Sequence, residues 1–230
     1  MPIKHLFFDL DHTLWDFNLN SRETLLELYN EIELQGLGVY SFDAFYHKYI
    51  EINDALWDLY RKDEISKQDL RSTRFYQALL FFGVDDVVLA ERIGDAYIKR
   101  CPVKVNLLAG CIEVLDYLNK RYQLHIITNG FEEVQHLKIK ASNLDQYFQN
   151  VITSEQAGVR KPHSDIFTHA LNNAGALAHE SVMIGDSLEV DCVPAENLGI
   201  QSVFFNPEKK AENKKVCYEI AHLKELIDLF

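Results

Sequence analysis

Residues 3–14 read IKHLFFDLDHTL, and this stretch decides the fold. The run Ile3–Asp9 is too short for a helix and ends abruptly in a turn that carries the carboxyl groups of Asp9 and Asp11. A short apolar run bounded by turn residues is typical of a buried strand. We therefore predict a strand in the core that ends at Asp9, with Asp11 in the turn that follows it.

Similar apolar runs recur later in the chain, and stretches with helical spacing separate most of them. The runs are Leu124–Thr128, Val151–Thr153, Val182–Gly185 and Ser202–Phe205. Apolar residues share one helix face after Gly110 (Ile112, Leu115 and Leu118) and again after Pro162 (Ile166, Phe167, Ala170, Leu171 and Ala174). Strands that alternate with helices predict an α/β fold, with a Rossmann-like parallel sheet core flanked by helices.

The segment from Asp16 to about Val103 interrupts this alternation, because it shows helical patterns and almost no strand signal. Two amphipathic patterns comprise Leu25, Leu28, Tyr29 and Ile32, then Phe42, Phe45, Tyr46, Tyr49, Asn53, Leu56, Trp57 and Tyr60. Ser66 with Asp69 resembles a capping box that opens a third helix, and Asp85 with Asp86 favours the start of a fourth. We predict an all-helical domain over residues 16–103, inserted into a core of residues 1–15 and 104–230. The polar segment Asn206–Lys215 is expected to be a surface loop.

The composition is that of a folded globular protein, with 47% hydrophobic and 25% charged residues among 230. The chain has 23 basic and 35 acidic residues, a net charge of −12. Proteins that bind nucleic acid polymers need clustered Lys and Arg for the phosphates, so this charge argues against such a function. An anionic small substrate would require a local positive group or a metal ion.

Cysteine usage and hydropathy point to the cytoplasm. Cys101, Cys111, Cys192 and Cys217 are scattered, without a C-x-x-C motif, so we expect buried reduced thiols rather than disulfides or a zinc site. No apolar run approaches the roughly 20 residues of a membrane span, and the N-terminus lacks a signal-peptide pattern. We expect a cytoplasmic monomer or homodimer without a membrane partner.

Polar side chains follow three of the predicted strands, at the edge where ligands bind in open α/β sheets. They are Asp9, Asp11 and Thr13, then Thr128 and Asn129, then Gly185, Asp186, Ser187 and Asp191. Carboxylates gathered in one crevice repel each other, and a hard cation such as Mg²⁺ relieves that repulsion while also binding phosphate. Asp9 could then attack phosphorus, and Asp11 could transfer protons. Asp191 fits a helix-start acid as well as a metal ligand.

Four landmarks, in order along nearly the whole chain, resemble those of the haloacid dehalogenase superfamily of phosphohydrolases. They are Asp9-Leu10-Asp11-His12-Thr13-Leu14, Ile126-Ile127-Thr128-Asn129-Gly130, Lys161-Pro162, and Gly185-Asp186-Ser187 with Asp191. The resemblance implies that Asp9 is the nucleophile, that Asp11 is the general acid and base, and that Thr128 and Lys161 are catalytic groups that bind the phosphate.

The resemblance also implies a metal site and a cap. Asn129 and Gly130 would add contacts to the phosphate. Asp9, Asp11 and Asp186 would bind Mg²⁺, and Asp191 would hold these ligands in place without binding the ion itself. The helical insertion resembles the family's first type of mobile cap. Its aromatic residues Tyr49, Trp57 and Tyr60 could stack on a ligand, although their spacing is more typical of the cap's own core.

His12 departs from the family, because many members have Gly at this position. We expect a tolerated turn residue whose side chain points away from the reaction. His125, His136 and His163 fit no metal spacing. The run Thr128–Phe131 (TNGF), the run Arg160–Pro162 (RKP) and the non-Gly residue in the first landmark most resemble the bacterial pyrimidine 5′-nucleotidase branch.

The leading hypothesis is a Mg²⁺-dependent phosphomonoesterase that acts through an aspartyl-phosphate, on a small ester such as a nucleoside 5′-monophosphate. Sugar-phosphate or phosphoglycolate phosphatases and phosphomutases would use the same residues. A 2-haloacid dehalogenase would need no metal, and Asp11 argues against it because that branch lacks the second acid. The complete set of site residues argues against a non-catalytic binding protein.

Overall fold

The computed structural model describes residues 2–209 and 216–230. The chain divides into two compact units. One consists of residues 1–17 and 105–230 and contains the sheet, and the other consists of residues 18–104 and is helical. We call them the sheet unit and the helical unit.

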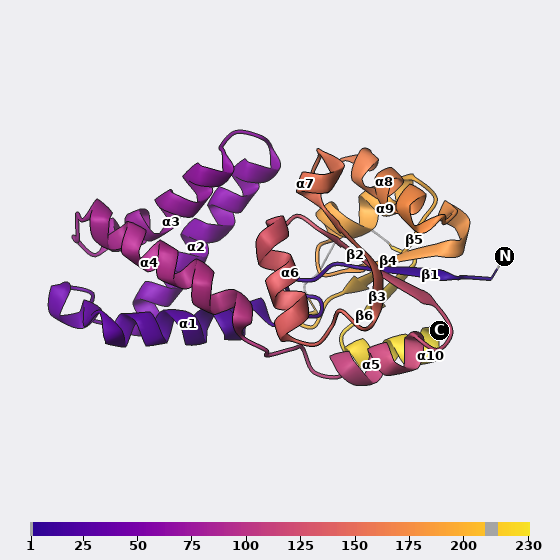
Figure 1. Cartoon of the computed structure of the whole chain (residues 1–230), viewed down its shortest axis with the longest axis horizontal. Coiled ribbons are helices and arrows are strands. Elements are labelled where there is room, and N and C mark those ends of the chain that lie inside the picture. Colours follow the sequence, from indigo (N-terminus) through magenta and orange to yellow (C-terminus); the bar gives the residue numbers. More distant parts are fainter. Residues whose placement is uncertain (1, 210–215) are drawn as a thin grey trace. The chain divides into compact units, whose positions relative to one another are not determined.

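The sheet unit confirms the predicted fold class. Its six parallel strands are β1 (His5–Phe8), β2 (Gln123–Thr128), β3 (Phe148–Thr153), β4 (Ser181–Gly185), β5 (Gln201–Phe205) and β6 (Tyr218–Ile220). They lie in the order β3-β2-β1-β4-β5-β6 (Figure 1). The sequence analysis missed β6, because three residues of which two are exposed give no apolar run. The first strand, β1, is central, and β2 and β4 lie on either side of it.

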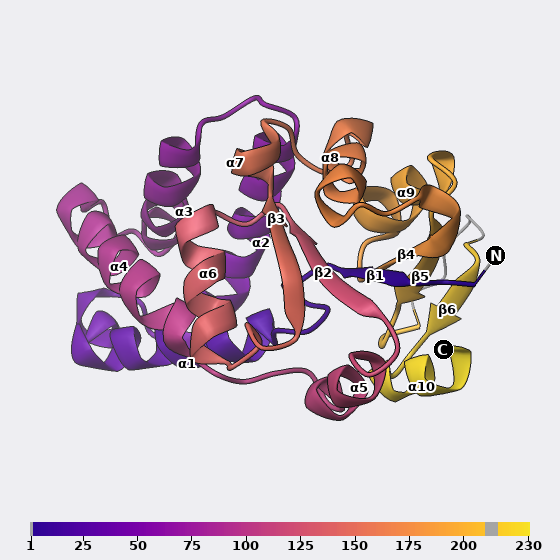
Figure 2. The same cartoon turned by 45° about the vertical axis from the view of Figure 1, so that its right-hand side comes forward.

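Helices cover both faces of this sheet. They are α5 (Cys111–Leu118), α6 (Glu132–Ala141), α7 (Ser154–Ala157), α8 (Ser164–Ala174), α9 (Val193–Asn197) and α10 (Leu226–Leu229), with short 3-10 turns at Ala178–Glu180 and Leu223–Glu225 and a π-turn at Leu188–Cys192. Figures 1 and 2 show α8 and α9 on one side of the sheet and α5 and α10 on the other. Phe7, Ile127 and Met183 pack with Ile166 and Phe167 of α8 in a buried cluster, which fixes the strands beneath that helix.

Three sequence predictions need correction in this unit. Ile112 is 40% exposed, because it lies about 120° from Leu118 around α5 and the buried face is centred on Val114 and Leu115. Cys217 is exposed, whereas the other three cysteines are buried, and all four are free thiols. Of the predicted loop at 206–215, Asn206 is buried and donates to Glu219 (2.7 Å), and residues 210–215 lie outside the described residues.

The helical unit contains α1 (Phe17–Glu31), α2 (Phe42–Arg61), α3 (Lys67–Phe81) and α4 (Val87–Arg100), with 3-10 turns at Leu34–Leu37 and Cys101–Val103. The Ser66–Asp69 capping box opens α3 as predicted, and the Asp86 side chain caps α4. Tyr49 is fully buried and stacks on Phe75 with ring centroids 5.2 Å apart. Tyr49 therefore belongs to the core of this unit.

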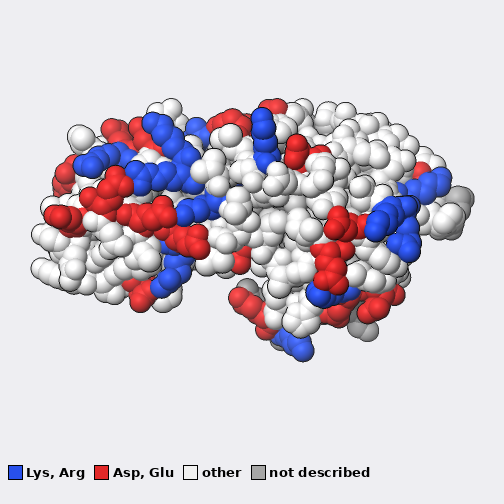
Figure 3. Space-filling model, turned by 60° about the horizontal axis from the view of Figure 1, so that its bottom comes forward, with Lys and Arg blue, Asp and Glu red and all other residues white. Residues whose placement is uncertain are grey.

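Basic and acidic side chains are interspersed on the face that Figure 3 shows. Among the described residues, no helix has the length and apolar character needed to cross a membrane.

Two buried histidines lie on neighbouring strands of the sheet unit, His5 on β1 and His125 on β2. His5 Nδ1 lies 3.1 Å from His125 Nε2, and Asn150 Nδ2 lies 3.0 Å from His125 Nδ1. Burial, together with His5, lowers the pKa of His125 to about 4, and burial also lowers the pKa of His5, although Glu180 opposes that change. Both imidazoles are therefore neutral in the folded protein at neutral pH.

This pair predicts an acid-labile element. Between about pH 4 and 6.5 the unfolded chain binds a proton at His125 that the folded chain does not, so stability falls as the pH falls through this window. The raised pKa values of Asp9 and Asp186 act in the opposite direction, so a matched variant is needed. We expect His125→Gln to reduce the slope of unfolding free energy against pH by up to about 1 kcal/mol per pH unit, measured by urea denaturation. Identical slopes for the two proteins would contradict the assignment.

Candidate active site

The carboxyl ends of β1, β2 and β4 lie side by side at one edge of the sheet. Phe8 pairs in register with Ile126 of β2 and with Ile184 of β4, and the Asp9 N–H donates to the Ile184 carbonyl at 2.9 Å. The residues that follow these strands therefore meet, although they come from three distant parts of the sequence.

Three carboxylates meet at this edge. Asp9, Asp186 and Asp191 each offer an oxygen, and these oxygens all lie within 4.8 Å of one another. Asp186 follows β4 directly, and Asp191 lies on the π-turn Leu188–Cys192. The site is tight, since a Cβ at Gly185 would overlap the Asp191 carboxyl group. The strand-end rule predicted the convergence of Asp9 and Asp186.

Lys161 is the counter-charge of the cluster. Its Nζ donates to Asp9 Oδ1 and Asp191 Oδ1, both at 2.7 Å, and to the Ile127 carbonyl at 2.8 Å. The residue is only 2% exposed, so these three acceptors replace water around the ammonium group. Asn129 holds the Lys161 backbone at both ends: its Oδ1 accepts from the N–H and its Nδ2 donates to the carbonyl, each at 2.8 Å.

The cluster carries excess negative charge. Burial raises the pKa of Asp9 to about 6 against the opposing effect of Lys161, with further contributions from Asp191 and Asp11. Burial and the charge of Asp9 likewise raise the pKa of Asp186 to about 6. The pKa of Lys161 is raised by Asp191 and Asp9 despite its burial. Three carboxylates with one ammonium group leave a net demand for positive charge.

The carboxylate oxygens that accept no hydrogen bond show which aspartates are available to bind a cation. Lys161 and the Ser187 N–H occupy the two oxygens of Asp191, at 2.7 and 3.2 Å. Asp9 and Asp186 each have one oxygen that accepts no hydrogen bond from another described residue. Hard divalent cations prefer carboxylate oxygens as ligands, so Asp9 and Asp186 are suited to bind such an ion. Asp191 would not bind it directly, because both of its oxygens already accept hydrogen bonds.

The side chain of Asp11 lies outside this cluster, which differs from the predicted ligand set of Asp9, Asp11 and Asp186. Asp11 Oδ1 accepts from Lys138 Nζ at 2.6 Å, and Oδ2 accepts from Gln135 Nε2 at 2.8 Å. Burial alone would raise the pKa of Asp11, but Lys138 and Gln135 outweigh that effect and the pKa is lowered. The Asp11 carboxylate is turned toward α6 because that helix supplies two donors.

The sequence analysis missed Gln135 and Lys138. Both come from α6, and both are buried. A polar residue at helical spacing is usually solvated, and its inward direction depends on how α6 packs. The available signal was their placement at positions i and i+3, next to Ile139, on the face that should pack against the sheet.

The backbone at His12 has a conformation that suits glycine. His12 has a φ of 62°, in the left-handed region that glycine adopts without strain. The His12 N–H donates to the Trp15 carbonyl at 3.0 Å, which closes the turn after β1. Its ring contacts Phe17, with centroids 4.9 Å apart. The turn therefore keeps its shape with a non-glycine residue at this position.

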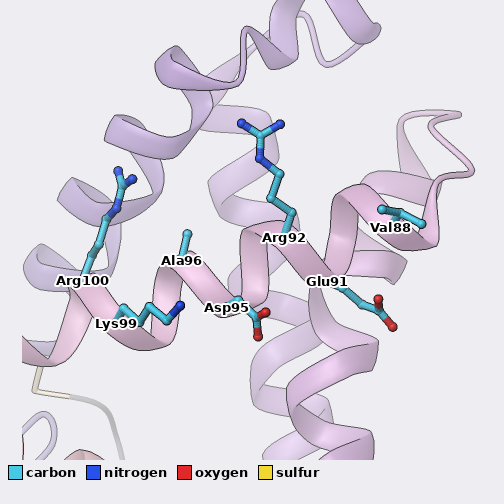
Figure 4. Close-up of a pocket in the computed structure, with 7 residues that line it drawn as sticks. All are labelled: Val88, Glu91, Arg92, Asp95, Ala96, Lys99 and Arg100. Carbon is cyan, nitrogen blue, oxygen red and sulfur yellow. The ribbon is translucent and has the colours of Figure 1, made fainter.

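A hollow of about 540 Å³ lies elsewhere, on the surface of α4 in the helical unit (Figure 4). Its lining residues all come from that helix: Val88, Glu91, Arg92, Asp95, Ala96, Lys99 and Arg100. The charges are of both signs, and none of these residues is among the predicted site residues. We assign this hollow no role.

Comparison with known proteins identifies the family of the chain. The family model "Haloacid dehalogenase-like hydrolase" matches residues 6–205, which contain all the strand-end residues described above. The chain belongs to this family of hydrolases. The resemblance seen in the four sequence landmarks is thereby confirmed, and with it the expectation of an enzyme.

Two relatives and one solved structure are similar to this chain over nearly its whole length. It is 34% identical to the pyrimidine 5′-nucleotidase PynA of Streptococcus pneumoniae, over 99% of this chain and 95% of that protein. It is 29% identical to a glyceraldehyde 3-phosphate phosphatase of Pyrococcus furiosus, over 99% and 92% of the two chains. The structure of YfnB from Bacillus subtilis, solved with bound magnesium, superposes with a TM-score of 0.89 at 24% identity and covers 100% of this chain and 99% of YfnB.

Proposed function

We propose that this hydrolase is a Mg²⁺-dependent phosphomonoesterase that works through an aspartyl-phosphate on Asp9. The observation that carries the proposal is the environment of Asp9. One carboxylate oxygen of Asp9 accepts a hydrogen bond from Lys161 and the other is free. An oxygen of Asp186 lies close enough to Asp9 for the two carboxylates to bind one Mg²⁺ ion. A partly buried carboxylate next to fixed positive charge is suited to attack the phosphorus of a dianionic ester.

In the first step the free oxygen of Asp9 attacks phosphorus with one lone pair, and the bond from phosphorus to the leaving oxygen breaks. The carboxylate has other lone pairs, so the attack does not remove Asp9 from the metal ion. Lys161 neutralises charge on the nucleophile and the phosphoryl group, and the hydroxyl of Thr128 donates to a phosphoryl oxygen. Asp9 and Asp186 would hold Mg²⁺, which when bound supplies positive charge to the phosphoryl oxygens. Backbone N–H groups near Gly130 would add donors to the phosphate.

Asp11 transfers the protons in this scheme. Without a ligand Asp11 is ionised, held by Lys138 and Gln135, and this form accepts a proton from the water that hydrolyses the aspartyl-phosphate. In the first step Asp11 must carry a proton for the leaving oxygen. The negative charge of an arriving phosphate ester raises the pKa of a nearby carboxyl group, which favours that protonation.

The proposed substrate is a pyrimidine nucleoside 5′-monophosphate. This proposal rests on the relative PynA and on the TNGF and RKP runs, Thr128–Phe131 and Arg160–Pro162. A small sugar phosphate is the second candidate, because the glyceraldehyde 3-phosphate phosphatase also aligns with nearly the whole chain. We also propose that the helical unit acts as the cap that selects the substrate.

A metal-dependent phosphate release assay tests the proposal. The chain is stripped with EDTA, and phosphate release from uridine 5′-monophosphate is measured with and without added Mg²⁺. We expect activity to fall at least about 100-fold without the metal and to return with it, because the repulsion between Asp9 and Asp186 is then uncompensated. A panel of nucleotides and sugar phosphates, compared by kcat/KM, identifies the substrate. Phosphate release that is indifferent to EDTA, or none from any ester, would refute the proposal.

A further inference from the structure

One face of α6 places two buried polar side chains against the groups proposed to do chemistry. Gln135 is fully buried, and Lys138 is 5% exposed. Residues three apart lie on the same helix face, so both reach Asp11 from one side. Burying an NH₂ group and an ammonium group is unfavourable unless they find hydrogen-bond acceptors, and here the acceptors of Gln135 Nε2 and Lys138 Nζ come from the candidate active site.

The Gln135 amide bridges two of these groups. Its Nε2 donates to Asp11 Oδ2 at 2.8 Å and to Thr128 Oγ1 at 3.0 Å. The orientation of the amide follows from chemistry, because an ionised carboxylate only accepts hydrogen bonds and the NH₂ group must therefore face Asp11. One side chain thus sets the separation between the proton-transfer group and Thr128.

The hydrogen bonds of Thr128 show what this bridge does. Thr128 Oγ1 accepts from the Gly130 N–H at 3.1 Å as well as from Gln135. A hydroxyl oxygen has two acceptor positions and one O–H hydrogen. With both acceptor positions taken, the O–H hydrogen is left in the remaining direction as a donor, which suits a phosphoryl oxygen.

Lys138 fixes the other oxygen of Asp11. Its Nζ donates to Asp11 Oδ1 at 2.6 Å and lies 4.3 Å from the centre of the Trp15 ring. Trp15 is fully buried, so the ammonium group rests on a rigid aromatic surface as well as on the carboxylate. Asp11 is therefore held at both oxygens.

Gly130 provides the space for this arrangement. A Cβ at position 130 would overlap the amide nitrogen of Gln135, and the other atoms nearest to that Cβ also belong to Gln135. Glycine is thus required here by the Gln135 side chain. An alanine at this position would have to displace the Gln135 side chain, which supplies the three atoms nearest to the added methyl group.

We propose that Gln135 and Lys138 are positioning residues of the reaction: they hold the Asp11 carboxylate, and Gln135 also aligns the Thr128 hydroxyl for the phosphate. The inference rests on the proposed phosphatase function and adds two residues that no sequence landmark contains. Gly130 has a part in it, because it makes room for Gln135.

A double-mutant cycle between Gly130→Ala and Gln135→Ala tests the bridge. We expect each single variant to lower kcat/KM for uridine 5′-monophosphate about 10- to 100-fold, because the reacting groups lose their alignment. The double variant should be no slower than Gln135→Ala alone, within about threefold, since the added methyl group then meets no amide. A stability role predicts losses in melting temperature instead, so the melting temperature of every variant is measured in parallel.

Lys138→Met tests the second contact, and Lys140→Met is its matched control, because Lys140 is an exposed lysine on the same helix. We expect at least about a tenfold loss of kcat/KM for Lys138→Met and less than about a twofold change for the control. In the Asp11→Asn background the effect of Lys138→Met should shrink to less than about threefold.

The outcomes separate this inference from the proposed function. Wild-type protein that releases no phosphate from any ester refutes the proposed function. An active wild type with unchanged Gln135→Ala or Lys138→Met variants, or with losses that multiply in the double variants, overturns the role of these residues alone.

Discussion

Replacing Asp9 with asparagine is expected to abolish turnover, with kcat reduced by at least about 10⁴-fold, because an amide oxygen is a poor nucleophile toward phosphorus. The substitution changes the chemistry of residue 9 and leaves the packing of the site unchanged. Asn has the same shape as Asp, and Lys161 keeps its hydrogen bonds to Asp191 and to the Ile127 carbonyl. Loss of activity would then report the chemistry of one carboxylate rather than collapse of the site.

Stability separates the chemical effect from a structural one. The Asp9 carboxylate is partly buried beside Asp186 and Asp191, and its pKa is raised by desolvation and by the charge of Asp191. Removing one of the three charges relieves repulsion, so Asp9→Asn should melt at the wild-type temperature or above it. The control is Asp145→Asn, which removes an exposed carboxylate in the same unit. It should leave both activity and melting temperature unchanged.

The covalent intermediate gives a second measurement. Wild-type protein quenched in acid during turnover and treated with hydroxylamine should carry a hydroxamate on the peptide that contains Asp9, detected by mass spectrometry. The Asp9→Asn variant should carry none. Turnover of Asp9→Asn near the wild-type rate, or a label on another residue, would show that the nucleophile lies elsewhere.

The strands of the sheet unit were predictable because their signal is local. Each buried strand is a short apolar run, and the rule that parallel strands present their carboxyl ends at one edge brings Asp9 and Asp186 together without further information. The starts of two helices in the helical unit were predictable for the same reason. Ser66, Asp69 and Asp86 are capping residues, and capping depends only on the neighbouring backbone. The three-residue strand β6 has no such local signal.

The direction of side chains was not predictable in the same way. Asp11 and Asp191 are both acids of the landmarks, one near Asp9 and the other near Asp186 in the sequence. No sequence pattern shows why Asp191 joins the cluster while Asp11 turns toward α6. The difference arises from the partners in space, Lys161 for one and Lys138 with Gln135 for the other. Those contacts depend on helix packing, which periodicity leaves undetermined.

Replacing Lys161 with methionine is expected to have the largest effect on stability. Methionine fills a similar volume but leaves Asp9, Asp186 and Asp191 without a counter-charge, within 4.8 Å of one another. Breaking a buried ion pair by removing one partner costs about 3–5 kcal/mol, and kcat/KM should fall at least about 10³-fold because the phosphoryl charge loses its ammonium partner. Urea denaturation without divalent ions measures the first effect.

The pH dependence of that cost identifies its cause. Without Lys161 the folded-state pKa values of the carboxyl groups rise further, so the folded chain binds more protons than the unfolded chain above about pH 4. The loss of stability should therefore be smaller at about pH 5 than at about pH 8, where the carboxyl groups must be ionised. Asp9→Asn should recover part of the loss in the double variant, because it removes one of the unpaired charges. A cost that is equal at both pH values and unrelieved by Asp9→Asn would mean that Lys161 contributes packing, and that charge balance is not what holds the acidic cluster together.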